Sequence, residues 1–307
     1  MISPSLFRQD DAVPDIALLP EMPQKTVVVT STLYDPSREI VSGDAVLRMG
    51  LAYELFVKAR GLGYDVVTVD GGSPGAWLSG VRDLGVVVLE EDISERVGLH
   101  PMGKARRQAL EVAGNLGTHD VIYWTEPEKH PLFDQRGPVE HAYALAMMSA
   151  VVAGGKGVIA IGKRKDGLQS YPAQQRFCEL AGNFTITSML DAYLKKVGIK
   201  EGAPYLDHWN GPRAISRDAL DLFLQYDGTI GGVAVDDRWG MHTVAPWIAL
   251  AQQLPVKGVV VDYTHPVDQT AFEENPDCRA LYDKKRIDQL TCLVDTCRTF
   301  VEHYRPS

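Results

Sequence analysis

The stretch Asp120-Val-Ile-Tyr-Trp-Thr-Glu-Pro-Glu-Lys129 carries the clearest fold signal in this 307-residue chain. Its apolar, aromatic-rich first part is typical of a buried β-strand, and the strand breaks off at two acids, Glu126 and Glu128. Pro127 favours an extended backbone here, and in an extended chain side chains two positions apart point to the same side. We therefore expect both carboxylates to converge on one cation, as a hard divalent ion that bridges a diphosphate requires. The alternative is a solvated acid pair beside Lys129.

Strand-like and helical patterns alternate around this stretch. The expected strands are residues 26–30, 66–69, 86–89, 121–124, 158–161 and 256–263. The expected helices are residues 44–60 with Asp44 as the cap, 74–83, 104–113, 139–153, 170–181, 183–197, 216–226, 243–254 with Pro246 near its start, and 279–303. The alternation predicts an α/β fold, with a mostly parallel central sheet and helices on both faces. Ligands bind such sheets beyond the carboxyl ends of the strands.

The bulk composition excludes several classes of protein. Hydrophobic residues make up 45% and charged residues 23%, as in ordinary globular proteins, and the net charge of −9 argues against a nucleic-acid partner. The four cysteines form no C-x-x-C pair, which favours free thiols in a reducing compartment. Residues 1–23 lack the pattern of a signal peptide, and no apolar run is long enough for a transmembrane segment, so we expect a cytoplasmic protein.

A second acid follows a predicted strand in the segment Val66-Val-Thr-Val-Asp70-Gly-Gly-Ser73. Glycines permit positive backbone angles and the close approach of a flat ligand, so Asp70 could accept hydrogen bonds from a base edge or a ribose. The alternative is an Asp-Gly turn that only reverses the chain.

A basic segment, Gly98-Leu-His-Pro-Met-Gly-Lys-Ala-Arg-Arg-Gln108, leads into a predicted helix. Lys104, Arg106 and Arg107 lie in its first turn, where cations oppose the helix dipole. A bound diphosphate would compensate for this, because helix N-termini bind anions. The alternative is that at least one of the two arginines is simply solvated.

In this order, the strand ending in Asp70-Gly-Gly-Ser, the basic helix start and the strand ending in an acid pair resemble the GT-A glycosyltransferases, most closely the family 2 type. The resemblance is good over residues 25–130 and holds only in outline beyond. It implies one GT-A-like domain over residues 25–307, with residues 1–24 as an N-terminal extension. Residues 25–130 would form its nucleotide-sugar-binding half, and residues 131–307 a more irregular acceptor-binding half with a C-terminal helix.

The same resemblance implies a function and a set of site residues. The protein would move a sugar from a UDP- or GDP-linked donor to a small-molecule or glycan acceptor, with Mg²⁺ or Mn²⁺ as the cofactor. Asp70 would contact the nucleoside, Lys104 and Arg107 the phosphates, and the pair Glu126 and Glu128 the metal or the donor sugar. Glu-Pro-Glu stands here in place of the family's usual Asp-x-Asp, and its longer side chains on a stiffer backbone place the carboxylates differently.

Candidates in the second half are implied by their place in the chain. Asp236 or Asp237 would orient or deprotonate the acceptor, although an aspartate there could equally cap a helix. His265, after the last predicted strand, would be a third metal ligand. His208 and Trp209 suit the acceptor side, because aromatic faces and polar groups bind sugars, although they also suit ordinary loop packing.

Two other functions remain open. A sugar-1-phosphate nucleotidyltransferase has a related architecture, but residues 31–38 lack its glycine-rich basic loop. A non-catalytic nucleotide-sugar-binding protein of the same fold is the other alternative. The sequence contains no Walker loop, nucleophile elbow or G-x-G-x-x-G at the first strand–helix junction, which disfavours nucleotide hydrolysis and hydride transfer.

The long C-terminal helix is a plausible surface for a homo-oligomer.

Overall fold

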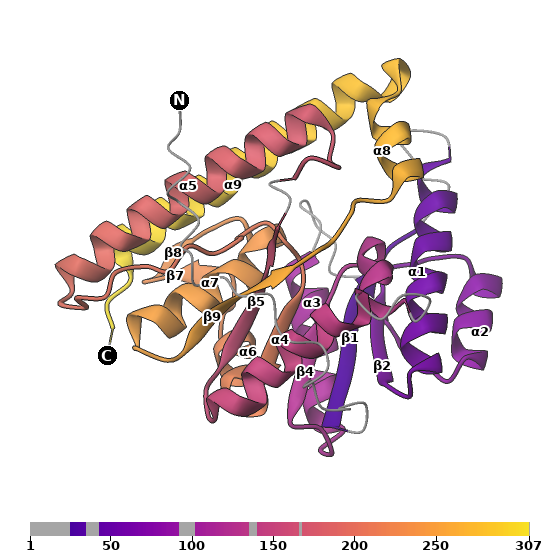
Figure 1. The fold of residues 1–307 in the computed structure, drawn as a ribbon, viewed down its shortest axis with the longest axis horizontal. Coiled ribbons are helices and arrows are strands. Elements are labelled where there is room, and N and C mark those ends of the chain that lie inside the picture. Colours follow the sequence, from indigo (N-terminus) through magenta and orange to yellow (C-terminus); the bar gives the residue numbers. More distant parts are fainter. Residues whose placement is uncertain (1–24, 35–42, 92–101, 135–139, 166–167, 307) are drawn as a thin grey trace.

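The computed structural model describes residues 25–34, 43–91, 102–134, 140–165 and 168–306. A seven-stranded sheet in the order β3-β2-β1-β4-β6-β5-β9 forms its centre (Figure 1). The strands are β1 Thr26–Thr32, β2 Asp65–Asp70, β3 Val87–Glu90, β4 Val121–Trp124, β5 Ile159–Arg164, β6 Arg213–Ser216 and β9 Val256–Val261. Strand β6 runs antiparallel to both of its neighbours, and the other pairs are parallel.

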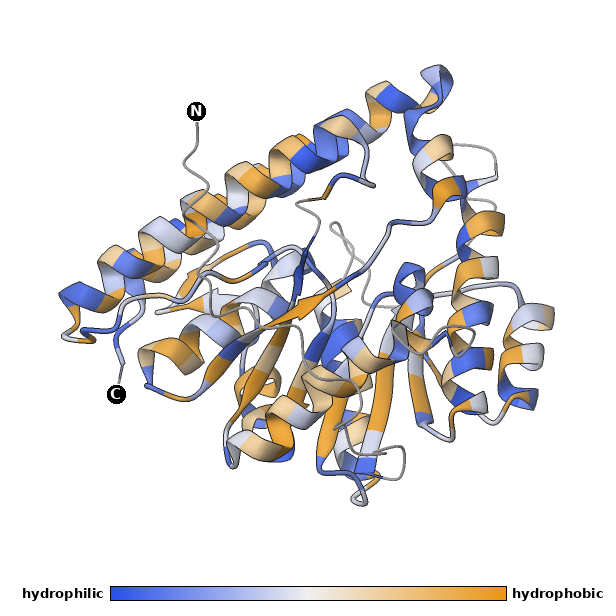
Figure 2. Cartoon of the chain, in the orientation of Figure 1, coloured by the Kyte–Doolittle hydropathy of each residue, from blue (hydrophilic) through white to orange (hydrophobic). Residues whose placement is uncertain are grey.

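The central strands are apolar on both faces, because helices cover both. Along β1, Val27 and Val29 pack into one hydrophobic cluster and Val28 into another. Along β4, Ile122 contributes to the first cluster and Tyr123 to the second. Successive residues therefore feed two separate cores, as the alternation of side chains along a strand requires. Figure 2 shows the resulting apolar band through the strands.

The helices divide between the two cores. On the side of Val28 lie helices α1 Asp44–Gly61, α2 Gly75–Asp83, α4 Glu140–Gly154 and the 3₁₀ helix η6 Pro127–Phe133. On the side of Val27 lie α3 Met102–Asn115, α5 Ala173–Lys196, α6 Leu220–Leu224, α7 Asp237–Ala251 and α9 Pro276–His303. The long helices α5 and α9 lie side by side across one end of the molecule (Figure 1). The predicted α/β class, with a mostly parallel sheet covered on both faces, is confirmed.

Helix α5 corrects the prediction of two helices over residues 170–181 and 183–197. Gly182 does not interrupt it. Instead this glycine packs against Trp209, where an added Cβ atom would lie 2.6 Å from the indole Nε1 atom. The glycine is therefore required by close packing and not by a change of chain direction.

Helix α7 begins at Asp237, six residues before the predicted start at 243, so that Pro246 lies in its interior. Its first turns contain Gly240, and glycine is an unfavourable residue in a helix interior. Helix α1 differs in its cap: Gly43, with a φ of 92°, is the N-cap, and the Asp44 carboxylate instead accepts a 2.8 Å hydrogen bond from Arg48.

Several short elements were not predicted. They are strand β6, the hairpin β7 Thr229–Ile230 with β8 Val233–Ala234, and helix α8 Val267–Glu274. The helix expected over residues 216–226 is shorter, because Ser216 ends β6 and the 3₁₀ turn η7 Arg217–Ala219 precedes α6. Elements of two to eight residues carry too few repeats of a periodic pattern to stand out in a sequence.

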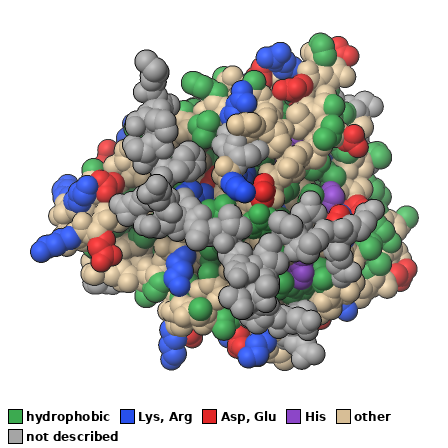
Figure 3. All heavy atoms as spheres, viewed as in Figure 1, with side chains coloured by type: hydrophobic (Ala, Val, Ile, Leu, Met, Phe, Trp, Pro, Cys, Tyr) green, Lys and Arg blue, Asp and Glu red, His purple; other side chains and the backbone are tan. Residues whose placement is uncertain are grey.

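Among the described residues, basic and acidic side chains are mixed over the face seen in Figure 3. Within the described ranges, no helix has both the length and the apolar character that crossing a membrane would require.

Candidate functional site

A cavity of about 580 Å³ lies where β1, β4, β5 and β9 end. The segments that follow or end these strands form its floor: residues 30–34, Trp124 and 126–129, Arg164 and His265. Helices form its walls, with Arg48 from α1, Arg106 from α3, Gln175 and Glu179 from α5, Trp239 and His242 from α7, and Lys285 and Arg286 from α9. The cavity thus occupies the carboxyl edge at which α/β sheets bind ligands.

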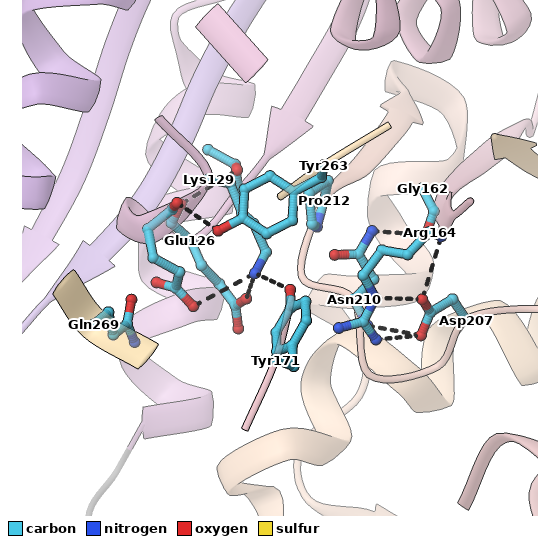
Figure 4. A network of polar contacts seen from close by, with 12 residues as sticks. Glu126, Lys129, Gly162, Arg164, Tyr171, Asp207, Asn210, Pro212, Tyr263 and Gln269 are labelled. Atoms are coloured by element: carbon cyan, nitrogen blue, oxygen red, sulfur yellow. Dashed lines mark hydrogen bonds and ion pairs between the residues drawn. The ribbon is translucent and has the colours of Figure 1, made fainter. Parts of the chain in front are cut away.

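Glu126 and Glu128 both face this cavity, although the backbone between them differs from the expectation. Glu126 is extended, with φ −98° and ψ 150°, but Pro127 starts the 3₁₀ helix η6, so Glu128 lies in a helical turn. Proline at the first position of a helix fits because its missing N–H needs no partner there. The two carboxylates still converge, and the cation at their meeting point is Lys129. Its Nζ atom lies 3.9 Å from Glu126 Oε2 and 3.8 Å from Glu128 Oε1 (Figure 4).

Lys129 is held on all sides. Its side chain is 4% exposed, and its ammonium donates a 3.1 Å hydrogen bond to the Tyr171 hydroxyl. The same ammonium lies 4.4 Å from the centre of the Tyr263 ring, within the range of a cation–π contact. The Tyr263 hydroxyl in turn donates to the Glu128 carbonyl oxygen at 2.8 Å. This sequence of contacts fixes both the lysine and the turn that carries the acids.

The pKa values of the two glutamates shift in opposite directions. Burial, and then the nearby Glu128 carboxylate, raise the pKa of Glu126. Burial would also raise the pKa of Glu128, but the positive charges of Lys129 and Arg48 outweigh it and lower that pKa to about 2. Glu128 is therefore held as an anion, whereas Glu126 retains a proton more readily.

Gly211, just before β6, lets Glu126 approach the backbone. A Cβ atom at this glycine would lie 2.4 Å from the Glu126 carboxyl carbon, a distance that real structures do not tolerate. This role could not be predicted, because nothing within the loop connects residue 211 to residue 126.

Of the three basic residues at the start of α3, only Arg106 lines the cavity. It is 7% exposed, and its Nη1 atom donates to the Arg238 carbonyl oxygen at 2.8 Å and contacts His242 Nδ1 at 2.9 Å. Within the described residues, Arg106 forms no ion pair and its Nε atom has no hydrogen-bond partner. Arg107 instead pairs with Asp237 at 2.8 Å, and Lys104 is exposed on the outer side of the helix.

The opposite wall carries a second basic group, formed by Arg48, Lys285 and Arg286, that was not predicted. Arg286 pairs with Glu273 at 2.9 Å, and the Lys285 ammonium lies 5.4 Å from the centre of the Tyr282 ring. Burial, followed by the charges of Arg48 and Arg286, lowers the pKa of Lys285 to about 7. The Lys284-Lys285-Arg286 run was its only signal, and such runs usually mark a solvated helix face.

Asp70, predicted to contact the nucleoside, does not line the cavity formed by the described residues. Its carboxylate accepts hydrogen bonds from the Thr32 hydroxyl at 2.7 Å, the Ser73 hydroxyl at 2.6 Å, and the backbone N–H groups of Gly72 and Ser73 at 2.8 and 2.7 Å. These four bonds fix the turn after β2. They favour the turn-forming alternative, and contact with a nucleoside stays a prediction.

Asp236 and Asp237 lie at the start of α7, outside the residues that line the cavity. Asp236 caps the helix by accepting a 2.9 Å hydrogen bond from the Arg238 N–H, and it also binds the Arg238 guanidinium. Asp237 pairs with Arg107, and burial raises its pKa despite that partner. Their predicted role as a base stays untested.

The remaining candidates divide between the cavity and the core. Trp209 and His265 line the cavity, whereas His208 is buried behind it and contacts Trp247 Nε1 at 3.3 Å. His265 Nδ1 is 2.8 Å from the Thr270 hydroxyl. Burial and then Lys129 lower the pKa of His265 to about 3, so its ring is neutral near neutral pH.

The residues present suit a divalent cation only in part. No cluster of three or more His, Cys, Asp or Glu side chains suited to a metal ion occurs in the part of the chain that the structure describes. Mg²⁺, however, needs only one or two carboxylates when water and substrate phosphates complete its shell. The carboxylate oxygens of Glu126 and Glu128 therefore fit a cation that arrives with a diphosphate.

No family model and no curated protein matches this chain. Among solved structures, it is similar to glucosyl-3-phosphoglycerate synthase from Mycobacterium tuberculosis in complex with Mn²⁺, UDP and glucosyl-3-phosphoglycerate, with 14% identity and a TM-score of 0.46 over 92% of this chain and 86% of that one. The complex of that synthase with Mn²⁺, UDP-glucose and phosphoglyceric acid gives the same values. The complex with Mg²⁺ and UDP gives 13% identity and a TM-score of 0.41 over 84% and 79% of the two chains. The likeness spans most of both proteins and is remote.

Proposed function

We propose that this protein is a glycosyltransferase that moves a sugar from a nucleoside diphosphate donor to an acceptor hydroxyl. The observation that carries the proposal is that the acid pair after β4 and the buried Arg106 of α3 line one cavity at the carboxyl edge of the sheet. A pyrophosphoryl group needs cations on one side and, for metal-assisted transfer, carboxylates on the other. Had the two groups lain on opposite sides of the molecule, this function would have had no support.

Arg106 would stabilise the negative charge that develops on the leaving diphosphate. Its guanidinium is buried, and a cation in such surroundings interacts strongly with an incoming anion. Its Nε donor, without a partner among the described residues, supplies a further hydrogen bond. Lys104 and Arg107, which do not line the cavity, would add positive charge from the same end of the helix.

A divalent cation, Mg²⁺ or Mn²⁺, would be held by Glu126 and Glu128 together with the donor phosphates. When bound, it supplies additional positive charge to the leaving group. The neutral ring of His265 lies in the same cavity and would either complete the site or orient the donor sugar.

The wall formed by Arg48, Lys285 and Arg286 would select an acceptor that carries a phosphate or carboxylate group. Three basic side chains outnumber the acids Asp44 and Glu273 that pair with two of them. Trp209 and Trp239 provide apolar faces on which a sugar ring can pack.

Calorimetry with UDP- and GDP-linked sugars, with and without Mg²⁺ or Mn²⁺, tests the proposal. We expect one of these donors to bind, and we expect Arg106→Met to weaken it about tenfold or more, because a buried charge-assisted contact is lost. Arg60→Met is the matched control, since Arg60 pairs with Asp65 and lies outside the cavity lining.

Failure of every nucleotide to bind would contradict the proposal. Pyrophosphate exchange with a sugar phosphate would instead indicate the nucleotidyltransferase. Donor binding without any transfer or hydrolysis, unchanged by Glu128→Gln, would indicate the non-catalytic binding protein.

A further inference from the structure

Lys129 occupies the point at which the two carboxylates of the cavity converge. Its ammonium lies 3.9 Å from Glu126 and 3.8 Å from Glu128, which is the position of a cation between two ligands. A hard divalent ion and an ammonium therefore compete for the same two carboxylates. This competition requires no movement of the backbone, because the carboxylates already converge.

The contacts of Lys129 on its other side do not depend on the acids. The ammonium donates to Tyr171 at 3.1 Å and lies 5.5 Å and 4.4 Å from the ring centres of Tyr171 and Tyr263. These groups keep a buried ammonium solvated even when the carboxylates turn toward another cation. The lysine can therefore release the acids without being left without partners.

The charge of the site depends on this one residue. When both carboxyls are ionised, the trio carries one net negative charge with Lys129 present and two without it. Other charges also act on the pair, since Arg48 lies near Glu128 and Arg106 near Glu126. These arginines are held by partners of their own, Asp44 for Arg48 and the Arg238 carbonyl for Arg106.

We propose that Lys129 is an internal counterion that holds Glu126 and Glu128 together in place of a divalent cation and thereby weakens metal binding to the free protein. A cation delivered with a donor diphosphate has the phosphates as additional ligands and displaces the ammonium from the acids. Lys129 is thus a positioning residue that couples metal binding to donor binding. This inference rests on the acid-pair metal site of the proposed function.

Mn²⁺ binding to the nucleotide-free protein tests the proposal without any measurement of activity. Electron paramagnetic resonance of free Mn²⁺ gives the dissociation constant for wild type, Lys129→Met and the double variant Lys129→Met/Glu126→Gln. We expect Lys129→Met to bind Mn²⁺ about tenfold or more tightly than wild type, because a full competing charge is removed. The double variant should lose this gain.

Lys58→Met is the matched control. Lys58 is also largely buried and pairs with the acids Glu54 and Asp134, but it lies outside the cavity lining. We expect its Mn²⁺ affinity to equal that of wild type, which separates a local effect from a change in net charge.

Thermal unfolding provides a second readout. Mn²⁺ should raise the Tm of Lys129→Met while leaving wild type and Lys58→Met unchanged. Lys129→Gln, whose amide can still hydrogen bond to Tyr171, replaces the methionine variant if the latter does not fold, with the same expectation.

The proposal would be overturned if Lys129→Met or Lys129→Gln bound Mn²⁺ no more tightly than wild type. It would also be overturned if Lys58→Met gained as much Mn²⁺ affinity as Lys129→Met. Donor calorimetry on wild type separates this failure from failure of the proposed function. If the donor binds and the lysine variants gain no metal affinity, only the role of Lys129 is wrong.

Discussion

Strands β2 and β4 of one sheet both lead into acids, and the two strand ends differ in what these acids contact. After β2, the Asp70 carboxylate is satisfied by four donors from its own turn and from Thr32. After β4, Glu126 and Glu128 share the cation Lys129 and remain open to a cavity of about 580 Å³. The difference lies in the residues that follow each acid. Gly72 and Ser73 supply N–H and hydroxyl donors, whereas Pro127 supplies no N–H and begins a 3₁₀ turn.

The largest effect should come from removing the Asp70 carboxylate at the end of β2. Asp70→Ala leaves the Thr32 and Ser73 hydroxyls and two N–H groups without their acceptor, so we expect the free energy of unfolding to fall by about 3 kcal/mol. Urea unfolding measures it. An unchanged stability combined with a large loss of nucleotide affinity would instead assign Asp70 to binding.

A substitution in the acid pair after β4 should reduce activity more than it reduces stability. Glu128→Gln keeps the shape of the side chain but removes the charge that Lys129 and Arg48 stabilise. We expect sugar transfer to slow by about 100-fold, the typical loss for one electrostatic contact at a reacting centre. Steady-state transfer assays give this value, with Glu54→Gln, an exposed glutamate of α1, as the control. A loss of stability as large as that of Asp70→Ala would remove the contrast between the two ends.

A smaller effect should follow from pushing Glu126 aside. Gly211→Ala places a Cβ atom 2.4 Å from the Glu126 carboxyl carbon, so the side chain must move. We expect donor affinity to fall about tenfold, equal to about 1.4 kcal/mol. Gly80→Ala in α2, where an added Cβ meets nothing within 4 Å, should leave donor binding unchanged. Equal calorimetric affinities for the two variants would show that the position of Glu126 is unimportant.

The smallest effect concerns the pH dependence of anion binding to the wall formed by Arg48, Lys285 and Arg286. The pKa of Lys285 is about 7 because burial and two arginines disfavour its charge, so the lysine is protonated below this pH and loses its charge above it. Affinity for sulfate, an anion of constant charge, should therefore fall about fivefold from pH 7 to pH 8. Lys285→Arg keeps the charge and should give a flat profile. A wild-type profile as flat as that of the variant would contradict this role.

The parts of the fold that the sequence predicted are those with strong local patterns. Strand β4 was predicted with its observed bounds, residues 121–124, because its apolar run is followed by two acids on either side of a proline. Strand β6 was not predicted, since four residues between a loop and a 3₁₀ turn show no periodicity. The two helices predicted over residues 170–181 and 183–197 are one helix, and its Gly182 is required by close packing against Trp209.

The candidate site also contains residues whose meeting could be predicted from the sequence and residues whose meeting could not. Glu126, Glu128 and Lys129 are neighbours in the sequence, and so their meeting could be anticipated. The choice between Arg106 and Arg107 could not, because adjacent residues on a helix point about 100° apart and the buried face depends on the rest of the fold. Arg48 and Lys285 come together only through the packing of α1 and α9 around one cavity, which no local pattern records.

The direction of strand β6 decides which loop reaches the cavity. Because it runs against its neighbours, the segment that enters it, and not the one that leaves it, reaches the edge of the sheet where the other strands end. That entering segment carries Trp209 and Gly211 to the cavity and to Glu126. This loop, residues 206–211, is itself fixed by buried contacts, among them the 2.6 Å ion pair of Asp207 with Arg164, so it adds a rigid wall beside the ends of the parallel strands.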